Sequence, residues 1–370
     1  MSEHSCGILT IHQTVNYGAT LQAFSTDRFL NQHGVPTLVV DYRQPTHEET
    51  STPRKALAVS WRKDNDRSFV HRLKLTAALL MTFPDKVKRY RRFERFRAKN
   101  MHLSAPCRDA ADICALDLKQ LVCGSDQIWN PALNGGMDPI YFGVLPYPHR
   151  TIAYAASMGC NAYCQEDLEC AVAWISAMSA CGVRETAMKD YLSQYVDRPL
   201  TQVLDPVFLP EKQDFLSIMS KRRQFGKPYL LLYSVVHNDK MQHYAQRLSE
   251  EKGLVLLEIR SGRVFGAGHR QVTNAGPEEF LRLLFDAEYV VTNSFHGTAF
   301  SIIFEKQFIV VNNAQRGSRI VDLLSVVGLS DRMIADDAIP SERIDYRSVK
   351  QRLAREQIRS RDFLLRALEE

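Results

Sequence analysis

The sequence contains no apolar run approaching the ~20 residues that a membrane-spanning helix needs. The first residues, MSEHSCGILTIH, contain neither a basic segment nor a long apolar segment. We therefore expect the first strand of the fold there and no secretory signal. Hydrophobic residues make up 45% of the chain and charged residues 24%, a balance that excludes disordered and fibrous proteins. Together these features predict a cytoplasmic protein.

The cysteines form neither a disulfide framework nor a zinc motif. No C-x-x-C pair occurs, and Cys160 and Cys164 have no second pair or nearby histidine to complete a tetrahedral site. The eight cysteines are Cys6, Cys107, Cys114, Cys123, Cys160, Cys164, Cys170 and Cys181. We expect reduced thiols, no bound metal and no organic cofactor.

Several nucleotide and hydrolase motifs are also missing. The sequence has no P-loop, no G-x-G-x-x-G and no G-x-S-x-G, so ATP-binding, NAD-binding and serine-hydrolase functions lose their main support. Residues 64–66 (DND) match the D-x-D pattern of metal-dependent sugar-nucleotide enzymes. This triplet lies in a basic polar loop rather than after a strand, and we treat the match as chance.

The chain does contain enough residues for two domains, 370 in all. Strands and helices alternate in two series that are separated by a break near residues 206–227. This pattern predicts two doubly wound parallel-sheet α/β domains facing a cleft. We expect an N-terminal domain over residues 1–206, a C-terminal domain over 207–345 and a final amphipathic helix over 346–370.

The positive charge is concentrated in one segment, a basic helical insertion at about residues 54–100. Residues 54–99 hold fifteen Lys and Arg against four Asp and Glu. Two helices are expected, near residues 67–81 and 85–99, separated by Pro84. In the second one, hydrophobic side chains recur every three residues, at Val87, Tyr90, Phe93 and Phe96. Two interpretations stay open: a helix that lies on an anionic membrane, or an apolar stripe packed on the domain.

Ligands of open parallel sheets bind beyond the carboxyl ends of the strands. The first polar cluster at such an end is residues 12–20, HQTVNYGAT. Asn16 can cap the following helix, and Gly18 lets the backbone approach a ligand closely. A capped turn without a ligand explains this pattern equally well.

The second cluster is residues 123–131, CGSDQIWNP, where Ser125, Asp126 and Gln127 follow a strand. Asp126 can act as a general base or hold sugar hydroxyls, or it can simply cap a helix. Trp129 can stack on a sugar ring, but a large aromatic residue after a strand more often belongs to the core.

The third cluster, residues 290–304 (VVTNSFHGTAFSIIF), is the most specific. A β-branched strand ends at Thr292, and the next helix begins near Gly297. His296 is therefore expected in the crevice beside a helix N-terminus, a place that suits a group that relays a proton.

Six blocks together give the sequence a recognisable pattern. They are GILTIHQTVNYGATLQAF, VCGSDQIWNP, AYAASMG, GVRETAMKDYL, VLDPVFL and TNSFHGTAFSIIFEKQF. In this order and spacing, from residue 7 to about 330, they resemble the polysaccharide pyruvyl transferase family. The resemblance implies a fold like that of two-domain GT-B glycosyltransferases. It also implies transfer of the enolpyruvyl group of phosphoenolpyruvate to a sugar of a cell-surface polysaccharide precursor, giving a pyruvate ketal.

The resemblance also implies roles for particular residues. His296 matches the functional histidine of the family and is our candidate acid, with Asp126 as candidate base. Arg184 matches an arginine for the anionic groups of the donor. Further candidate substrate-binding residues are Asn16, Gly18, Ser125, Gln127, Asn293, Ser294, Arg316 and Arg319. The expected partners are phosphoenolpyruvate, a sugar or lipid-linked glycan acceptor and the anionic inner face of the membrane, but not nucleic acid.

One position departs from the family pattern. The family has an arginine two places before the histidine, and this chain has Ser294 there. Arg316 or Arg319 is expected to replace the missing cation. Two alternatives stay open: a GT-B-like glycosyltransferase that uses a nucleotide sugar, or a non-catalytic glycan-binding relative.

Overall fold

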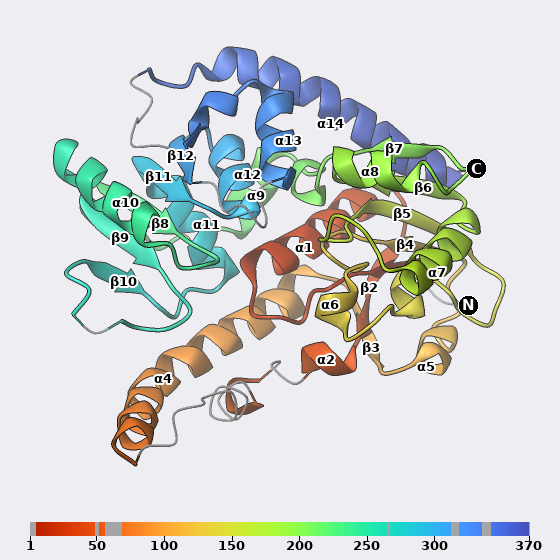
Figure 1. Cartoon of the computed structure of the whole chain (residues 1–370), viewed down its shortest axis with the longest axis horizontal. Helices are drawn as coiled ribbons and strands as arrows, with labels where there is room; N and C mark the ends of the chain where they lie inside the picture. The colour runs from red at the N-terminus through yellow and green to blue at the C-terminus, as the bar shows by residue number, and fades with distance from the viewer. Residues whose placement is uncertain are drawn as a thin grey trace.

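The structure is a computed structural model that describes residues 5–48, 52–55, 69–264, 266–311, 318–334 and 342–369. These residues form two α/β domains, each built on a parallel sheet with helices on its faces (Figure 1). The predicted fold class, two doubly wound parallel sheets, is confirmed.

The N-terminal sheet has seven strands in the order β3-β2-β1-β4-β5-β6-β7. The strands are β1 (Cys6–Leu9), β2 (Thr37–Tyr42), β3 (Leu103–Cys107), β4 (Gln120–Cys123), β5 (Arg150–Ala156), β6 (Ala180–Val183) and β7 (Leu200–Gln202). The helices of this half are α1 (Tyr17–Gln32), α2 (Pro45–Glu48), α4 (Phe69–Asn100), α5 (Ala110–Cys114), α6 (Pro131–Asn134), α7 (Gln165–Ser176) and α8 (Thr186–Leu192).

The C-terminal sheet has six strands in the order β10-β9-β8-β11-β12-β13. The strands are β8 (Tyr229–Tyr233), β9 (Val255–Ile259), β10 (Arg270–Val272), β11 (Tyr289–Thr292), β12 (Gln307–Val311) and β13 (Met333–Ile334). The helices are α9 (Lys212–Ile218), α10 (Asp239–Glu251), α11 (Pro277–Asp286), α12 (Phe295–Ile303), α13 (Ser318–Val327) and α14 (Tyr346–Glu369).

Each sheet has a point where the strand order reverses, and this point forms the crevice in which open α/β sheets bind ligands. In the N-terminal sheet it lies between β1 and β4, whose ends pair at Leu9 and Cys123. In the C-terminal sheet it lies between β8 and β11, whose ends pair at Tyr233 and Thr292. The three predicted polar clusters follow β1, β4 and β11, so the topology places all of them at these two crevices.

The two domains share a continuous apolar core. Tyr17 of α1 stacks on Phe280 of α11, with 4.2 Å between the ring centroids, and its hydroxyl donates to the carbonyl of Ala275. Phe24 of α1 packs against Phe215 of α9. An apolar interface of this kind holds two domains in a fixed relative position, unlike the polar interfaces of mobile domains.

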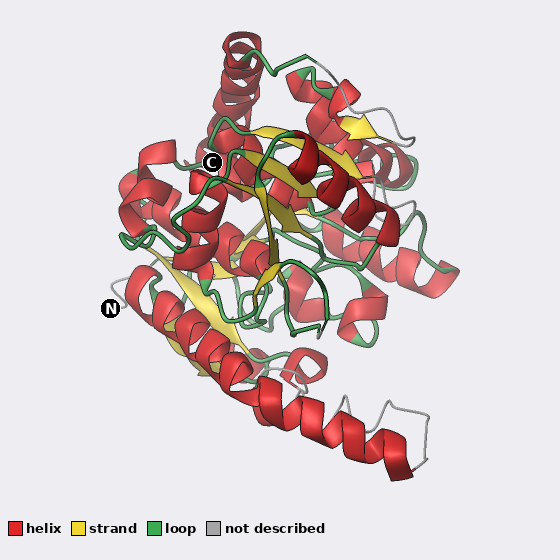
Figure 2. Cartoon of the chain, turned by 90° about the vertical axis from the view of Figure 1, so that its left-hand side faces the viewer, coloured by secondary structure: helices red, strands yellow, loops and turns green. Residues whose placement is uncertain are grey.

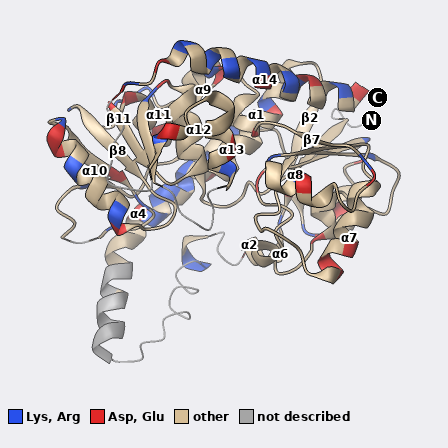
Figure 3. Ribbon diagram, turned by 45° about the horizontal axis from the view of Figure 1, so that its top comes forward, with Lys and Arg blue, Asp and Glu red and all other residues tan. Residues whose placement is uncertain are grey.

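Helix α14 follows the C-terminal sheet but runs along both domains (Figure 1). Its last turns contact the N-terminal sheet. The side chains of Gln120 and Arg150 donate to the carbonyl oxygens of Leu368 and Ala367 at 2.8 and 2.9 Å. Lysines and arginines occur along the whole length of this helix, with a few acidic residues between them (Figure 3). Among the described helices, none is long and apolar enough to cross a membrane.

Helix α4 corrects one prediction, because Phe69–Asn100 is a single helix that contains Pro84 rather than two helices separated by it. Its first turns extend away from the body of the protein (Figure 2). Phe93 and Phe96, in its last turns, are fully buried against Tyr17 and Phe24. This packing holds the second half of the helix in place, so proline costs one hydrogen bond without ending the helix. It also favours the packed interpretation of the apolar stripe.

Candidate active site

The crevices of the two sheets meet in one cavity of about 320 Å³. Residues after β1 and β4 line one side of it, and residues after β8 and β11, together with the start of α13, line the other. Of the predicted site residues, Asn16, Asp126, Gln127, Asn293, Ser294, His296 and Arg319 line this cavity. Its volume lies in the range of sites for small-molecule ligands.

His296 lies in the first turn of α12. Ser294 caps this helix, and its hydroxyl accepts a hydrogen bond from the backbone N–H of Gly297. The side chain of His296 is 10% exposed, and its Nε2 lies 3.7 Å from Oδ1 of Asp205. The Nε2 atom has no hydrogen-bond partner among the described residues. The ring is thus held beside a carboxylate at an ion-pair distance while it borders the cavity.

Gly18 packs against the other side of the His296 ring. A Cβ atom added to Gly18 would lie 2.0 Å from Nδ1 of His296. Such a separation is far below any van der Waals contact, so only glycine fits here. The sequence predicts a close approach of a ligand to the Gly18 backbone; in the structure, the group that lies against Gly18 is the His296 ring.

Asp205, just after β7, is the buried carboxylate behind His296. Its Oδ2 accepts hydrogen bonds from Nη1 of Arg184 at 2.7 Å and from the hydroxyl of Ser125 at 3.3 Å. Its Oδ1 accepts from the backbone N–H of Val207. Burial raises the pKa of Asp205, but His296, Arg184 and the Val207 N–H together lower it well below its usual value. Asp205 is therefore a carboxylate at neutral pH.

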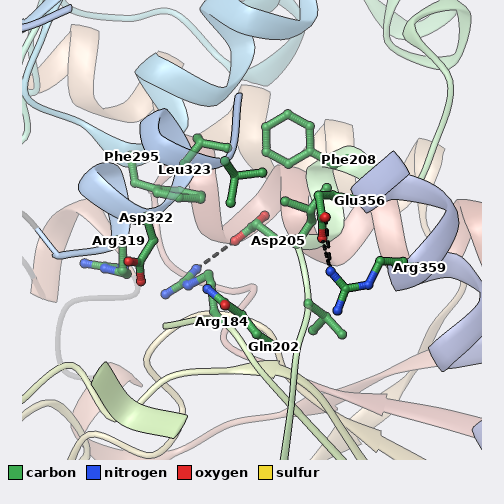
Figure 4. Close-up of a pocket in the computed structure, with 13 residues that line it drawn as sticks. Arg184, Gln202, Asp205, Phe208, Phe295, Arg319, Asp322, Leu323, Glu356 and Arg359 are labelled. Carbon is green, nitrogen blue, oxygen red and sulfur yellow. Dashed lines mark hydrogen bonds and ion pairs between the residues drawn. The ribbon is translucent and has the colours of Figure 1, made fainter. Parts of the chain in front are cut away.

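Arg184, at the end of β6, lies behind the cavity rather than in its wall. Figure 4 shows its guanidinium directed at Asp205. Burial lowers the pKa of Arg184, and Glu185, Asp205 and Asp126 raise it by a larger amount. Arg184 and Phe295 line a separate, smaller cavity of about 60 Å³. The guanidinium carbon of Arg184 lies 5.2 Å from the centroid of the Phe295 ring. The position of Arg184 suits neutralisation of buried carboxylates.

Asp126 is the carboxylate that faces the cavity. Its Oδ1 accepts a hydrogen bond from the backbone N–H of Gln127 and lies 3.9 Å from Arg184 and 4.0 Å from Arg319. Its side chain is 18% exposed. A carboxylate that borders the cavity in this way can accept a proton from a bound hydroxyl.

Arg319 of α13 brings a cation to the cavity from the C-terminal domain. Its Nε lies 3.7 Å from Oε1 of Glu185. Burial, and next the positive charge of Arg184, lower the pKa of Arg319 from its usual value. Helix α13 is tied to the N-terminal domain next to Arg319, because the backbone N–H of Thr186 donates to Asp322 at 2.9 Å. Arg184 and Arg319, from the two domains, both lie within 4 Å of Oε1 of Glu185.

The other candidates take several positions. The side chain of Asn16 caps α1, as expected, and accepts from the backbone N–H groups of Gly18 and Ala19. The amide of Asn293 bonds to the backbone of Val235 and Val236, which fixes the segment after β8. Ser125 is fully buried and does not line the cavity. Arg316 lies outside the described residues.

Two residues of the cluster were not among the sequence candidates, namely Asp205 and Glu185. Oε1 of Glu185 accepts from the hydroxyl of Ser157 at 2.6 Å and lies near both arginines. Both residues belong to sequence blocks that carry the family resemblance, VLDPVFL and GVRETAMKDYL. An acidic residue inside such a block is the signal that could have identified them.

Trp129 belongs to the core. Its ring is stacked on Phe142 and its Nε1 donates to the carbonyl of Tyr141, so it does not face a sugar. In the part of the chain that the structure describes, no group of three His, Cys, Asp or Glu side chains is arranged to hold a metal.

The sequence of the chain matches the model of one protein family. A sequence model described as polysaccharide pyruvyl transferase matches residues 16–315. No curated protein matches the chain at a significant level.

Several solved structures are similar to the chain at low sequence identity. The UDP-GlcNAc 2-epimerase from Neisseria meningitidis bound to UDP-GlcNAc is 7% identical with a TM-score of 0.49, and the alignment covers 98% of each chain. The S. aureus MnaA–UDP structure is 11% identical with a TM-score of 0.48, over 98% of this chain and 90% of that one. The E. coli ADP-heptose LPS heptosyltransferase II is 8% identical with a TM-score of 0.36, over 96% and 99%. All three scores lie below 0.5, and the two-domain architecture rests on the chain's own sheets.

Proposed function

Because the chain belongs to the polysaccharide pyruvyl transferase family, we propose that it transfers the enolpyruvyl group of phosphoenolpyruvate to a sugar of a cell-surface polysaccharide precursor. The product would be a pyruvate ketal, with inorganic phosphate released. The observation that carries this proposal is the meeting of an imidazole, a carboxylate and a guanidinium, from His296, Asp126 and Arg319, in one cavity between the domains.

The chemistry defines what these groups must do. A proton adds to the methylene carbon of phosphoenolpyruvate, and the adjacent carbon becomes an oxocarbenium-like centre. One sugar hydroxyl attacks this carbon and loses its proton. The carbon–oxygen bond to phosphate then breaks, and a second hydroxyl attacks and loses its proton to close the ketal. The site therefore needs an acid, a base and cations for the donor.

His296 is the proposed acid. It borders the cavity at the N-terminus of α12, and its Nε2 lies 3.7 Å from the Asp205 carboxylate. Gly18 and Asp205 confine the ring from two sides. A confined ring delivers its proton from one position, which is what a positioned general acid contributes. Asp205 is thus a proposed positioning residue.

Asp126 is the proposed base for the sugar hydroxyls, and Arg319 the proposed cation for the donor's anionic groups. Arg184 would act behind them. It pairs with Asp205 at 2.7 Å and lies 3.9 Å from Asp126, so it offsets part of the negative charge of both carboxylates. A dianionic donor also needs further positive charge, and Arg316 stays the proposed second donor cation.

Incubation with phosphoenolpyruvate and a hexose acceptor tests the proposal, with inorganic phosphate and the ketal product measured together. We expect phosphate release that depends on the acceptor and a product that retains all three pyruvate carbons. Transfer of a sugar from a nucleotide sugar, without consumption of phosphoenolpyruvate, would contradict the proposal and favour a glycosyltransferase.

A further inference from the structure

A second, smaller cavity adjoins the one that contains His296. It measures about 180 Å³ and lies beyond the carboxyl ends of β8 and β9. Val15, Asn16 and Val235 line both cavities. A ligand that extends from His296 past these three residues enters the second cavity, which we call the Arg89 compartment. Its other lining residues include Arg89, Ser234, Arg260 and Ser261.

Arg89 reaches this compartment from α4, and it is 8% exposed. Its guanidinium makes only long hydrogen bonds, 3.3 Å to the carbonyl of Arg260 and 3.5 Å to that of Val15. Within the described residues, its Nε has no hydrogen-bond partner and no carboxylate lies within 4 Å of its guanidinium nitrogens. The face of the Tyr17 ring lies 4.8 Å from the guanidinium carbon. Among the residues that the structure describes, Arg89 is therefore a buried cation without a counter-ion.

Its neighbours on the same helix differ in this respect. Arg92 pairs with Glu279 at 3.3 Å, and Arg97 pairs with Glu94. Burial of a guanidinium without a carboxylate partner destabilises the folded protein, because the charge loses its hydration. Its planar donor groups match phosphate oxygens in a bidentate manner. The unmatched charge of Arg89 therefore points to an anionic ligand.

The charges also differ between the two ends of the combined cavity. Near His296, three carboxylates (Asp126, Glu185 and Asp205) accompany two arginines. In the Arg89 compartment, the nearby Glu258 carboxylate is paired with both Arg260 and His269 at 2.8 Å. The excess positive charge is thus in the Arg89 compartment and not among the groups around His296.

We propose that the Arg89 compartment is an anion subsite that binds a phosphate group of the acceptor. This inference rests on the proposed function. The sugar would lie near Asp126 and His296, and its phosphate or diphosphate ester would extend past Val15 and Val235 to Arg89. The acceptor would then be a sugar carried on a phosphate ester rather than a free sugar.

Calorimetric titration with two probes, inorganic pyrophosphate and phosphoenolpyruvate, tests the subsite without any turnover. Pyrophosphate should bind the wild-type protein. Arg89→Gln should weaken that binding by about tenfold or more, the value of a hydrogen bond to a charged group, while phosphoenolpyruvate binding changes less than about threefold. Arg95→Gln, an exposed arginine six residues further along α4, is the matched control.

Because Arg89 is buried, its substitution can disturb folding. A second variant therefore tests the subsite while Arg89 stays in place. Ser261 lines the compartment and is exposed, and Ser261→Asp places a negative charge there while Arg89 stays. It too should weaken pyrophosphate binding by about tenfold. Pyrophosphate binding that is absent in the wild type, or equal in all four proteins, would overturn the subsite. Equal weakening of both probes would overturn the acceptor assignment and place the donor phosphate here.

Kinetics separate this inference from the proposed function. In an active enzyme, Arg89→Gln should raise the KM for a sugar 1-phosphate acceptor by about tenfold and leave the KM for phosphoenolpyruvate unchanged. An unchanged acceptor KM would overturn the acceptor assignment. If pyrophosphate binding needs Arg89 but phosphoenolpyruvate is never consumed, the proposed function fails and the anion subsite stands.

Discussion

Gly18 and His296 are in contact across the interface between the two domains, so closely that a methyl group on Gly18 would lie 2.0 Å from Nδ1 of the imidazole. Gly18 belongs to the first turn of α1, and His296 to the first turn of α12. The helix that follows the first strand of the N-terminal sheet thereby fixes the position of the proposed acid, which the C-terminal domain carries.

Gly18→Ala tests this contact. The added methyl group must displace the ring of His296, and a shift of about 1 Å in a reacting group lowers the rate by roughly 10²-fold. We expect kcat to fall by that order, with the protein still folded. Gly226→Ala is the control, since an added Cβ meets nothing within 4 Å there. Unchanged kcat in Gly18→Ala would show that the ring position is not critical.

His296→Ala tests the acid itself. Loss of a general acid lowers turnover by about 10²–10⁴-fold, and the side chain makes no hydrogen bond that folding requires among the described residues. We expect a near-normal thermal unfolding temperature together with this loss of kcat. Wild-type turnover in a well-folded variant would remove His296 from the mechanism.

Asp205→Asn tests the carboxylate behind His296. The pKa of Asp205 is lowered in the folded protein, so its contribution to stability is fully present above the unfolded value of about 4 and is lost as the pH falls below that value. Breaking a buried ion pair with Arg184 costs about 3–5 kcal/mol.

The measurement is urea unfolding of both proteins at several pH values. The difference in the free energy of unfolding should be largest near pH 7 and should shrink below about pH 4. A difference that is the same at every pH would contradict the ionised state of Asp205.

Arg319→Ala tests donor binding. Loss of a partly buried charged contact should lower kcat/KM for phosphoenolpyruvate. The corresponding activation free energy should rise by about 2–4 kcal/mol. Arg184→Ala and Arg316→Ala are measured beside it, and Arg355→Ala, an exposed arginine of α14, is the control. Wild-type donor kinetics in Arg184→Ala, Arg316→Ala and Arg319→Ala alike would argue against phosphoenolpyruvate as the donor.

Phe93→Ala separates the two interpretations of the basic helix. Phe93 is fully buried against Tyr17, so its truncation should lower stability by about 3–5 kcal/mol. Co-sedimentation with anionic liposomes should be the same as for the wild type, because this ring is not available to lipid. A folded variant with weaker liposome binding than the wild type would restore the membrane interpretation of this stripe.

The local pattern of the sequence determined the elements and several site positions. The alternation of strands and helices along the chain predicted two parallel sheets. Capping residues and a β-branched strand predicted the cap at Asn16 and the place of His296 at the end of a strand. These features depend on neighbours in the chain, and therefore periodicity and capping residues report them directly.

Only the tertiary structure decided which of these residues meet. Gly18, Asp205 and His296 come from three distant segments, and Arg184 lies behind the cavity that Arg319 lines. Pro84 lies inside α4 because the packing of Phe93 and Phe96 against α1 outweighs one lost hydrogen bond. Contacts of this kind depend on how the two domains pack, and the periodicity of a single segment carries no information about the element that will cover it.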